Sequence, residues 1–404
     1  MNTADKLRLG YLVPQFPGQT HIFFWREIAE LEARGVEVHL LSTQPPPAGL
    51  IAHDWSAEAM RRTSYLVSKN PWHLFRAALS QPWGQFLAEM RADGFAIARD
   101  IAVSLPAATR LFEYARANGL DHIHVHSCAR GALIAAMCKH MGGPTFSVTL
   151  HGPLSDYGPG QPLKWRGASF ATIITRKLEA EAKAALGAAM PSHIFIRPMG
   201  VDTEVLKRTA PYEAPKAGET IKLFSCARLN IVKGHQDAMK AVQHLIQQGV
   251  DIKLDIAGED DAGGSGYRRI LEETIEQLGI QDHVRLLGAI DADEVKAKLL
   301  EAHLFVLASW HEPLGVAYME AMSCGVPTIG TDAGGVPEMI TSGETAILVP
   351  PKSPQALAEA ILTLSHNPDE LTRLSKAGRA HMQQNYRASL GAETLINGIE
   401  GCET

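Results

Sequence analysis

The sequence has few of the features that mark secreted or membrane-spanning proteins. Its five cysteines are scattered, odd in number and never spaced as C-x-x-C, which fits reduced thiols rather than a disulfide framework or a zinc site. No apolar run reaches the ~18 residues that a membrane-spanning helix needs. The N-terminal residues 1–8 are too polar for a signal peptide. We therefore expect a cytoplasmic protein.

Two common nucleotide-binding motifs are also missing. No G-x-G-x-x-G follows the first strand predicted in either half of the chain, and no G-x-x-x-x-G-K-[ST] occurs. Dinucleotide oxidoreductases and P-loop ATPases therefore lose their main support. The formal net charge of -6 argues against a nucleic-acid partner.

The chain has the length and pattern of a two-domain α/β protein. It has 404 residues, 46% of them hydrophobic and 20% charged, which is ordinary for a globular protein but long for one domain. Strand, loop, helix and strand patterns follow one another in residues 7–41, and a second such series begins at Ile221. This order predicts two doubly wound, Rossmann-like parallel sheets.

The domain boundaries follow from the same pattern. Residues 212–220 are polar and aperiodic and are the candidate linker. We expect an N-terminal domain at 1–210, a C-terminal domain at 211–384, and a final helical segment at 385–404 that returns to the first domain.

Residues 51–118 break the alternating pattern, because they are mostly helical and mix aromatic with cationic side chains. Such a segment could bind an acceptor or lie on the anionic inner face of a membrane as a peripheral contact. It could equally be a helical insertion whose aromatics fill a core of their own. The residues concerned are Trp55, Trp72, Phe75, Trp83, Phe86, Phe95, Arg61, Arg62, Lys69, Arg76, Arg91 and Arg99.

The stretch from residue 304 to 325 is the most informative part of the chain. A buried strand is predicted at 304–307, followed by a loop that contains Glu312 and a helix that begins near Gly315. Amides at a helix N-terminus favour an anion, and Glu320 on that helix is able to reach a hydroxyl. Two carboxylates beside a phosphate-binding turn suggest a nucleotide sugar as the ligand.

Two cations follow the first strand of the second series. Arg228 and Lys233 come just after the predicted strand at 221–227. Arg offers a planar fork and Lys a point charge, so the two are suited to clamp a diphosphate.

One histidine stands out among seventeen. His151 follows a strand predicted at 144–150 and precedes Gly152, which would let the backbone approach a ligand closely. A capping or turn role is the alternative. His122, His124 and His126 would share one face of a strand, but adjacent positions on one strand converge poorly on a tetrahedral zinc ion.

Two other chemical interpretations are weaker. Cys128 lies near His126 in sequence, yet cysteine is among the most common buried residues and a sequence neighbour is not a spatial pair. Asp291 and Asp293 spell D-x-D, but they precede a helical segment, so an N-cap explains them without a metal. We expect no metal and no cofactor.

The chain resembles glycosyltransferase family 4, and within it the transferases of exopolysaccharide and colanic-acid assembly. The resemblance is carried by the E-x7-E motif from Glu312 to Glu320, by Gly325-Val326-Pro327, Gly334-Gly335 and Glu338, by Arg228 with Lys233-Gly234, by Arg285-Leu286-Leu287-Gly288, and more loosely by His126, His151-Gly152 and Gly200-Val201-Asp202. The first loop departs from the family, because Gly18 is followed by Gln19 rather than by a second glycine.

The resemblance implies a GT-B fold, with two Rossmann-like domains facing a cleft, and retaining, metal-independent transfer. The donor would be a nucleotide sugar, UDP-linked by preference, and the acceptor a hydroxyl of a glycan or lipid-linked molecule. In this scheme Arg228, Lys233 and the amides of Leu314, Gly315 and Val316 hold the diphosphate. Glu320 binds the ribose, Glu312 the sugar hydroxyls, and Gly288 and Ala289 the base, while His151 and Gly18 contact the donor from the first domain.

Other functions use the same residues. A phosphorylase or a nucleotide-sugar epimerase on this fold would use the same phosphate clamp, and a non-catalytic sugar-nucleotide sensor or scaffold subunit would keep only part of it. The complete set of His151, Arg228, Lys233, Glu312 and Glu320 argues against the sensor.

Overall fold

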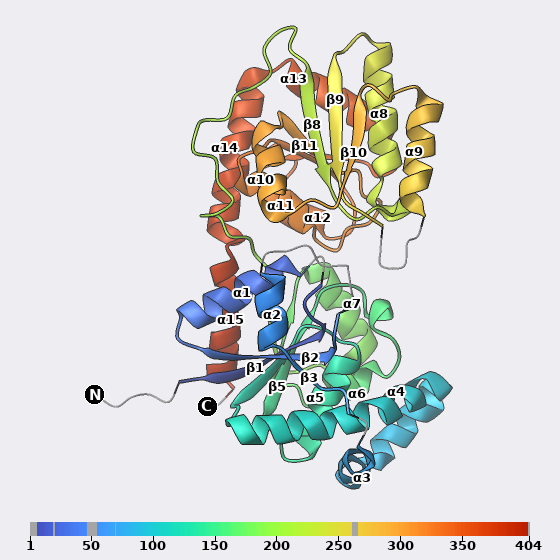
Figure 1. Ribbon diagram of the computed structural model, residues 1–404, viewed down its shortest axis with the longest axis vertical. Helices are drawn as coiled ribbons and strands as arrows, with labels where there is room; N and C mark the ends of the chain where they lie inside the picture. The colour runs from blue at the N-terminus through green and yellow to red at the C-terminus, as the bar shows by residue number, and fades with distance from the viewer. Residues whose placement is uncertain (1–5, 19–20, 47–54, 69, 261–265, 403–404) are drawn as a thin grey trace, which may run out of the picture. The chain divides into compact units, whose positions relative to one another are not determined.

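The computed structural model describes residues 6–18, 21–46, 55–68, 70–260 and 266–402. The chain forms two compact units, which Figure 1 shows: unit 1 comprises Met1–Met199 and Ser389–Thr404, and unit 2 comprises Gly200–Ala388. Each unit is a parallel sheet with helices packed on it, as the alternating strand and helix patterns predict.

Unit 1 is built on seven parallel strands in the order β3-β2-β1-β4-β5-β6-β7. The order reverses between β1 and β4, and ligands of such sheets bind at this switch point, outside the carboxyl ends of the strands. The strands are β1 Arg8–Gln15, β2 Glu37–Gln44, β3 Ser64–Tyr65, β4 His122–Val125, β5 Thr145–Leu150, β6 Phe170–Ile173 and β7 His193–Ile196. The α-helices are α1 Ile22–Ala33, α2 Ser56–Arg62, α3 Pro71–Leu79, α4 Trp83–Asn118, α5 Arg130–His140, α6 Gln161–Trp165, α7 Arg176–Leu186 and α15 Ala388–Glu400.

Unit 2 repeats the plan with six parallel strands in the order β10-β9-β8-β11-β12-β13, so its switch point lies between β8 and β11. The strands are β8 Ile221–Cys226, β9 Ile252–Ala257, β10 Val284–Gly288, β11 Leu304–Val306, β12 Thr328–Thr331 and β13 Ile347–Val349. The α-helices are α8 His235–Gln247, α9 Tyr267–Leu278, α10 Ala292–Glu301, α11 Val316–Ser323, α12 Val336–Met339, α13 Pro354–Ser365 and α14 Pro368–Asn385.

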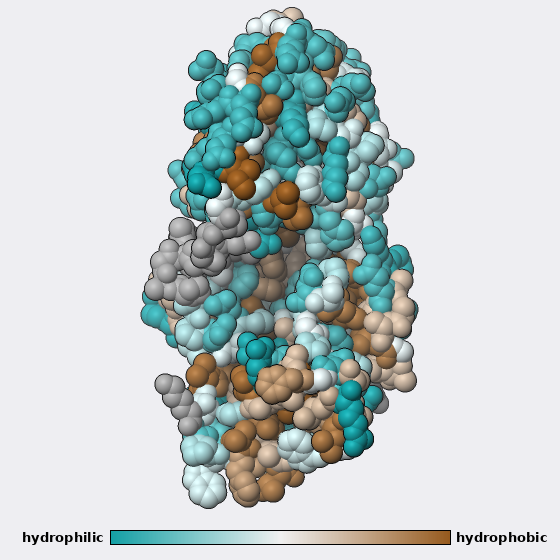
Figure 2. All heavy atoms as spheres, turned by 90° about the vertical axis from the view of Figure 1, so that its right-hand side faces the viewer, coloured by the Kyte–Doolittle hydropathy of each residue, from teal (hydrophilic) through white to brown (hydrophobic). Residues whose placement is uncertain are grey.

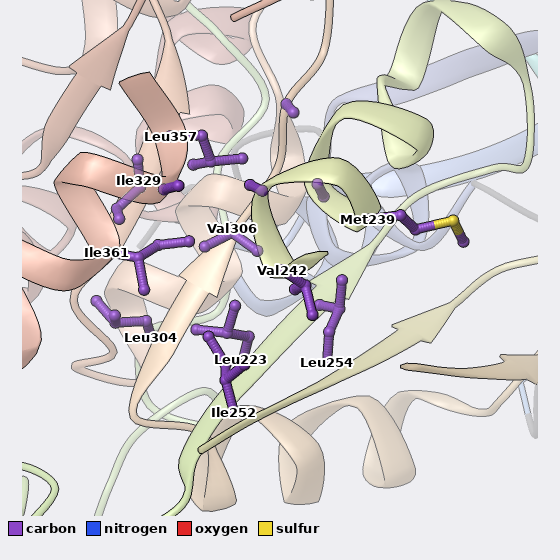
Figure 3. Close-up of a cluster of buried hydrophobic side chains, with 14 of the residues drawn as sticks. Leu223, Met239, Val242, Ile252, Leu254, Leu304, Val306, Ile329, Leu357 and Ile361 are labelled. Carbon is purple, nitrogen blue, oxygen red and sulfur yellow. The ribbon is translucent and has the colours of Figure 1, made fainter. Parts of the chain in front are cut away.

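A hydrophobic core holds the sheet of unit 2 to its helices (Figure 3). Leu223 and Leu254 project from neighbouring strands toward Met239 and Val242 of α8, and Ile361 of α13 closes the same cluster. All of these side chains are buried, and burying each contributes about 1.5–3 kcal/mol. This core fixes the strand ends that carry the candidate site.

The units divide at Met199, about ten residues before the boundary predicted at 210/211. Residues 200–210 lack periodicity, yet they are tied to unit 2. Leu206 O accepts hydrogen bonds from Ser323 Oγ at 2.7 Å and from Arg379 Nη1 at 3.2 Å. The predicted linker at 212–220 also belongs to unit 2, because the Tyr212 hydroxyl donates to His303 O at 2.8 Å.

The final helical segment predicted at 385–404 contains helix α15, which a break separates from helix α14. Helix α14 ends at Asn385, and its C-cap Tyr386 has backbone angles of φ -131° and ψ 26°, which leave the helical range. The residues after α14 pair with Val201 through two backbone hydrogen bonds. Val201 N donates to Tyr386 O, and Ala388 N donates to Val201 O. Helix α15 packs into the core of unit 1 through Ala392, Leu395 and Ile399.

The predicted helical insertion at 51–118 contains α2, α3 and α4, with the short strand β3 between the first two; residues 51–54 and 69 lie outside the described ranges. Helix α4 is bent at Gly94, whose φ of 71° is outside the helical range. Phe86 is fully buried, whereas Trp72 and Phe95 are 72% and 84% exposed. Some of the aromatics therefore form a core and others form a surface. Among the described residues, no helix is long and apolar enough to cross a bilayer.

Candidate functional site

The strongest cluster of candidate residues lies at the switch point of unit 2. Lys233 follows β8 and Glu312 follows β11, and these two strands are neighbours in the sheet. Lys233 Nζ lies 2.5 Å from Glu312 Oε2, and their side chains are only 13% and 10% exposed. The Ser309 hydroxyl donates to the same carboxylate oxygen at 3.3 Å. The two residues thus form one charged unit at the sheet edge.

The loop that carries Glu312 is held from three sides. Trp310 N donates to Val232 O at 2.7 Å, which ties the loop to the turn after β8. Thr331 Oγ1 donates to Ser309 O at 2.6 Å, and Gly335 N donates to Glu312 O at 2.9 Å, which ties it to β12 and the turn after it. The position of the Glu312 carboxylate is therefore determined by backbone contacts as well as by its ion pair.

Two glycines make this approach of loops feasible. Gly334 has φ +67°, and a Cβ there would lie 2.0 Å from Glu312 O. Gly234 has φ +68°, and a Cβ there would lie 1.8 Å from Ala308 O. Only glycine combines this backbone conformation with such close contact.

Helix α11 begins at Gly315, as the sequence predicts, with φ +95° at this N-cap. The first amides of a helix have no partner within the helix, so the amides around Gly315 have the arrangement that suits an anion. Tyr318 is fully buried below the turn and donates to Leu307 O at 2.7 Å. Glu320 lies later on the same helix and is half-buried. Burial, with a smaller contribution from the Glu320 charge, raises the pKa of Cys226 at the end of β8 to about 12.

The remaining donor-side candidates lie at neighbouring strand ends. Arg228 follows β8 and is exposed, and its carbonyl oxygen lies 3.2 Å from His235 Nε2. Gly288 ends β10 with φ +80°, and its carbonyl accepts a hydrogen bond from Gly258 N at 2.9 Å. Ala289 follows it and is exposed. These residues and the Lys233–Glu312 pair all lie at the carboxyl ends of β8, β10 and β11.

Gly18 and His151 belong to unit 1. A Cβ at Gly18 would lie 2.6 Å from the His21 ring, so the glycine makes room for that imidazole. His151 follows β5, and its Nε2 lies 3.3 Å from His126 Nδ1. Burial, with the neighbouring His126 and His21, holds the pKa of His151 well below its ordinary value. His151 is therefore a neutral imidazole at neutral pH.

A carboxylate missed by the sequence analysis lies behind these histidines. Glu27 on α1 is 3% exposed, and its Oε2 lies 3.0 Å from His126 Nε2. The Tyr11 hydroxyl donates to the same oxygen at 2.7 Å. The available signal was a charged residue on the apolar face of α1, beside Phe24 and Ile28.

The three histidines of the β4 segment do share one face, but two of them, His122 and His124, bind hydroxyl groups. His122 lies 2.7 Å from both Thr145 Oγ1 and Ser147 Oγ, and His124 lies 2.7 Å from Ser147 Oγ and 2.8 Å from Thr149 Oγ1. Both nitrogens of each ring are engaged along the neighbouring strand β5, so they do not converge on a zinc ion.

The two weaker interpretations from the sequence have structural explanations. The Cys128 thiol is buried and donates to Thr149 O at 3.7 Å, and burial raises its pKa, which keeps it protonated and poorly nucleophilic. Asp291 is the N-cap of α10, where its side chain accepts from Glu294 N at 2.8 Å in a capping box. In the described part of the chain, no cluster of three His, Cys, Asp or Glu side chains is arranged to hold a metal ion.

Trp310 is a second residue that the sequence analysis did not assign. Its indole Nε1 donates to Asp237 Oδ2 at 2.6 Å, and Lys352 Nζ lies 4.4 Å from the ring centroid. Its signal was its position two residues before Glu312. It links the loop after β11 to helix α8.

The part of the chain that carries the cluster in unit 2 matches a known protein family. Residues 207–381 match the protein family described as Glycosyl transferases group 1. The chain is 32% identical over 200 residues to the colanic acid biosynthesis glycosyltransferase WcaL of Escherichia coli strain K12, which covers 48% of this chain and 47% of that protein. The chain thus spans about half the length of the first curated relatives it matches. It is 27% identical over 324 residues to the GDP-mannose-dependent monoacylated alpha-(1-6)-phosphatidylinositol monomannoside mannosyltransferase of Corynebacterium glutamicum, covering 74% of this chain and 82% of that protein.

The solved structures extend the likeness to both units. The crystal structure of Anabaena Alr3699/HepE in complex with UDP matches with a TM-score of 0.75 and 17% identity, covering 98% of this chain and 100% of that chain. At this identity the match concerns the fold. It confirms the predicted GT-B fold, with two Rossmann-like parallel-sheet domains.

Proposed function

We propose that the whole chain transfers a sugar from a nucleotide-sugar donor to a hydroxyl of a glycan or lipid-linked acceptor in polysaccharide synthesis, because residues 207–381 match the family described as Glycosyl transferases group 1. The observation that carries the proposal is the Lys233–Glu312 pair at the switch point of unit 2, beside the N-terminus of α11. A cation, a carboxylate and helix amides together suit a ligand that has both phosphates and hydroxyls.

The proposed roles are those that the resemblance to the glycosyltransferase family implies for these residues. Arg228, Lys233 and the amides around Gly315 stabilise the negative charge that develops on the departing diphosphate, and fixed charges of this kind are commonly the largest catalytic contribution. Glu312 binds hydroxyls of the sugar, and Glu320 binds the ribose. The loop at Gly288 and Ala289 holds the base.

Transfer is proposed to retain the anomeric configuration and to need no metal or cofactor. The acceptor oxygen forms its bond to the anomeric carbon on the face from which the diphosphate departs. The bond between this carbon and the diphosphate oxygen breaks, and the acceptor proton passes to a leaving phosphate oxygen. His151 contacts the donor sugar near the reacting carbon as a neutral imidazole.

The nucleotide is proposed to be UDP. The structural neighbour Alr3699/HepE is in complex with UDP, whereas the mannosyltransferase relative is named for GDP-mannose, so the two comparisons point to different bases. A thermal-shift screen of UDP-, GDP- and ADP-sugars decides between them, because a ligand that binds the folded state raises Tm.

The screen is followed by an acceptor assay. Transfer of a labelled sugar supports the proposal, and proton NMR of the product gives its anomeric configuration. Release of a sugar phosphate in the presence of inorganic phosphate would indicate a phosphorylase, epimerised donor an epimerase, and binding without turnover a sensor.

A peripheral membrane contact is proposed for α3 and the first part of α4. Figure 2 shows apolar side chains gathered over the lower part of the molecule, where Figure 1 places these helices. Trp72, Phe75 and Leu79 are 72%, 56% and 73% exposed, and exposed apolar groups of this number mark an interaction site. Such a contact would bring the protein to a lipid-linked acceptor at the cytoplasmic face.

Vesicle sedimentation tests this contact. A triple change to alanine at Trp72, Phe75 and Leu79 is expected to abolish sedimentation with anionic vesicles. Ile270→Ala, which removes an exposed apolar side chain from α9 of unit 2, is the control and should have no effect. Unchanged sedimentation of the triple variant would contradict the contact.

A further inference from the structure

We propose that Glu27 and His126 are positioning residues that fix the tautomer of His151. The carboxylate of Glu27 determines which nitrogen of His126 carries the proton, and His126 in turn determines which nitrogen of His151 does. The inference rests on the proposed function in that it gives His151 a role at the sugar.

The three side chains form a line through the interior of unit 1. Glu27 comes from α1, His126 from the segment after β4, and His151 from the segment after β5. Glu27 Oε2 lies 3.0 Å from His126 Nε2, and His126 Nδ1 lies 3.3 Å from His151 Nε2. The first contact falls outside hydrogen-bond geometry, so Glu27 acts on His126 chiefly through its charge.

The part of this line formed by Glu27 and His126 is shielded from solvent, whereas His151 at its end is half-buried. Glu27 and His126 are each 3% exposed, and α15 covers the carboxylate so closely that a Cβ at Gly391 would lie 2.6 Å from Glu27 Oε1. In such surroundings a charge acts strongly on its neighbours, because water does not screen it.

The other titratable groups that face the line are few. Tyr11 of β1 donates to Glu27, and its ring centroid lies 4.3 Å from that of His126. The ring of His124 from β4 lies 4.5 Å from that of His126, and burial keeps the pKa of His124 well below its ordinary value. His21 and Tyr157 lie beside His151. Among these described groups, Glu27 is the carboxylate, so it supplies the negative charge.

The chemistry of the rings then sets the tautomers. A negative Glu27 favours the proton of His126 on Nε2, which leaves a lone pair on Nδ1. That lone pair accepts the Nε2–H of His151, so His151 keeps the lone pair on its own Nδ1. If the proton of His126 moved to Nδ1, His151 would have to carry its proton on Nδ1 and would present a donor in place of an acceptor.

A comparison of His126 with His122 and His124, which lie on the same face of the β4 segment, supports a specific role for His126. His122 and His124 each lie within 2.8 Å of two hydroxyl groups of β5, and hydroxyls adapt to either tautomer. His126 instead lies between a carboxylate and a second histidine. Of these three histidines, His126 contacts His151, and His126 is also the one whose tautomer a neighbouring carboxylate constrains.

The test begins with the tautomer itself, since this measurement does not depend on transferase activity. Nitrogen-15 NMR of histidine-labelled protein, with the His151 signals identified through His151→Gln, is expected to show one neutral tautomer protonated at Nε2. In Glu27→Gln the amide can donate to His126 Nε2, so the His151 tautomer is expected to reverse or become mixed. An unchanged tautomer would overturn the proposal.

Kinetics supply the second measurement. Glu27→Gln is expected to lower kcat by about 10- to 100-fold, as loss of a group that orients a functional histidine does, with the KM for the donor changed by less than about threefold. Tyr11→Phe is the matched control: it removes the hydroxyl bonded to the same carboxylate oxygen and leaves the line intact, so tautomer and kcat should stay close to the parent's.

The remaining outcomes are also decisive. If the parent protein transfers no sugar from any donor, the proposed function fails, while the NMR comparison still decides the relation between Glu27 and His151. If Glu27→Gln does not fold, His126→Asn, which keeps Glu27 and Tyr11 together, is expected to give a mixed His151 tautomer. A single unchanged tautomer in that variant would overturn the proposal.

Discussion

Lys233 Nζ and Glu312 Oε2 lie 2.5 Å apart, although seventy-nine residues separate them in the chain. The pair joins the turn after β8 to the loop after β11 and is almost fully shielded from solvent. The cation that we propose binds the diphosphate therefore already contacts the carboxylate that we propose binds the sugar. When a donor binds, its phosphates and hydroxyls must share these two groups.

Loss of the lysine should affect both stability and turnover. Lys233→Met leaves the Glu312 carboxylate buried without its partner, which is expected to cost roughly 3 kcal/mol of unfolding free energy. Because the same side chain is proposed to stabilise the leaving group, kcat is expected to fall by about 100- to 1,000-fold. Urea unfolding and a donor-turnover assay measure the two effects.

The exposed pair Lys183–Glu179 on α7 provides the control, since its atoms are 2.6 Å apart but the lysine side chain is 57% exposed. Lys183→Met should change stability by less than about 1 kcal/mol. The clamp assignment fails if a protein with both Arg228→Ala and Lys233→Ala keeps its donor turnover within about tenfold of the parent.

Gly334→Ala should displace the Glu312 loop. The new Cβ would lie 2.0 Å from Glu312 O, and Gly334 also has the positive φ of +67°. Gly343→Ala is a matched control, because Gly343 has φ +81° but no atom within 4 Å of a Cβ. We expect the control to lose about 1–2 kcal/mol of unfolding free energy from backbone strain alone. Gly334→Ala is expected to lose more unfolding free energy than the control and also to lose donor binding. Equal losses in the two variants would show that the contact with Glu312 is unimportant.

Stability should fall in mild acid because of the buried histidines of β4. Burial lowers the pKa of His122 to about 3 and that of His124 well below its ordinary value. In the unfolded chain both rings take up protons below a pH of about 6.5, whereas in the folded protein they do not. Unfolding free energy is therefore lost as the pH falls from about 6.5 toward 3, by roughly 2 kcal/mol at pH 5 for His122, and His124 adds to the loss in the same direction.

Urea unfolding at pH 7.5 and pH 5 measures this loss. His122→Gln should reduce the difference between the two values by about 2 kcal/mol, whereas His366→Gln, at an exposed position, should leave it as it is. A difference that His122→Gln does not alter would exclude His122 as its source.

Asp291 should matter for stability and not for turnover. Asp291→Ala removes the N-cap of α10 and is expected to cost about 1 kcal/mol, while Asp291→Asn, which still accepts the hydrogen bond from Glu294 N, should cost much less. Turnover is expected to be the same for both variants and for the parent, with or without EDTA. Loss of activity on chelation, restored by a divalent ion, would contradict metal-independent transfer.

The fold was predictable because its strands are short apolar runs that end in loops. Parallel strands buried on both faces have this pattern, and their alternation with amphipathic helices leaves few possible topologies. The same logic places Lys233 and Glu312 at strand ends. That β8 and β11 are neighbours, and that the two side chains pair, depends on sheet order, which local sequence does not specify.

The other differences have the same origin. Residues 200–210 have no periodicity, so their own sequence does not predict that they attach to unit 2 through Arg379. The break after α14 falls at Tyr386, where no proline or glycine marks it. Glu27 was missed because a carboxylate on an apolar helix face becomes informative only once His126 is known to lie 3.0 Å away.

The passage of α15 back to unit 1 has a consequence for biosynthesis. Unit 2 is one continuous stretch, Gly200–Ala388, whereas unit 1 needs Ser389–Thr404 to complete its core around Leu395 and Ile399. On the ribosome, the first 199 residues emerge without the helix that covers Glu27. Since domains fold as units, the part of the protein that is synthesised second can reach its final structure first, and unit 1 is completed only when the last turn of α15 has left the exit tunnel.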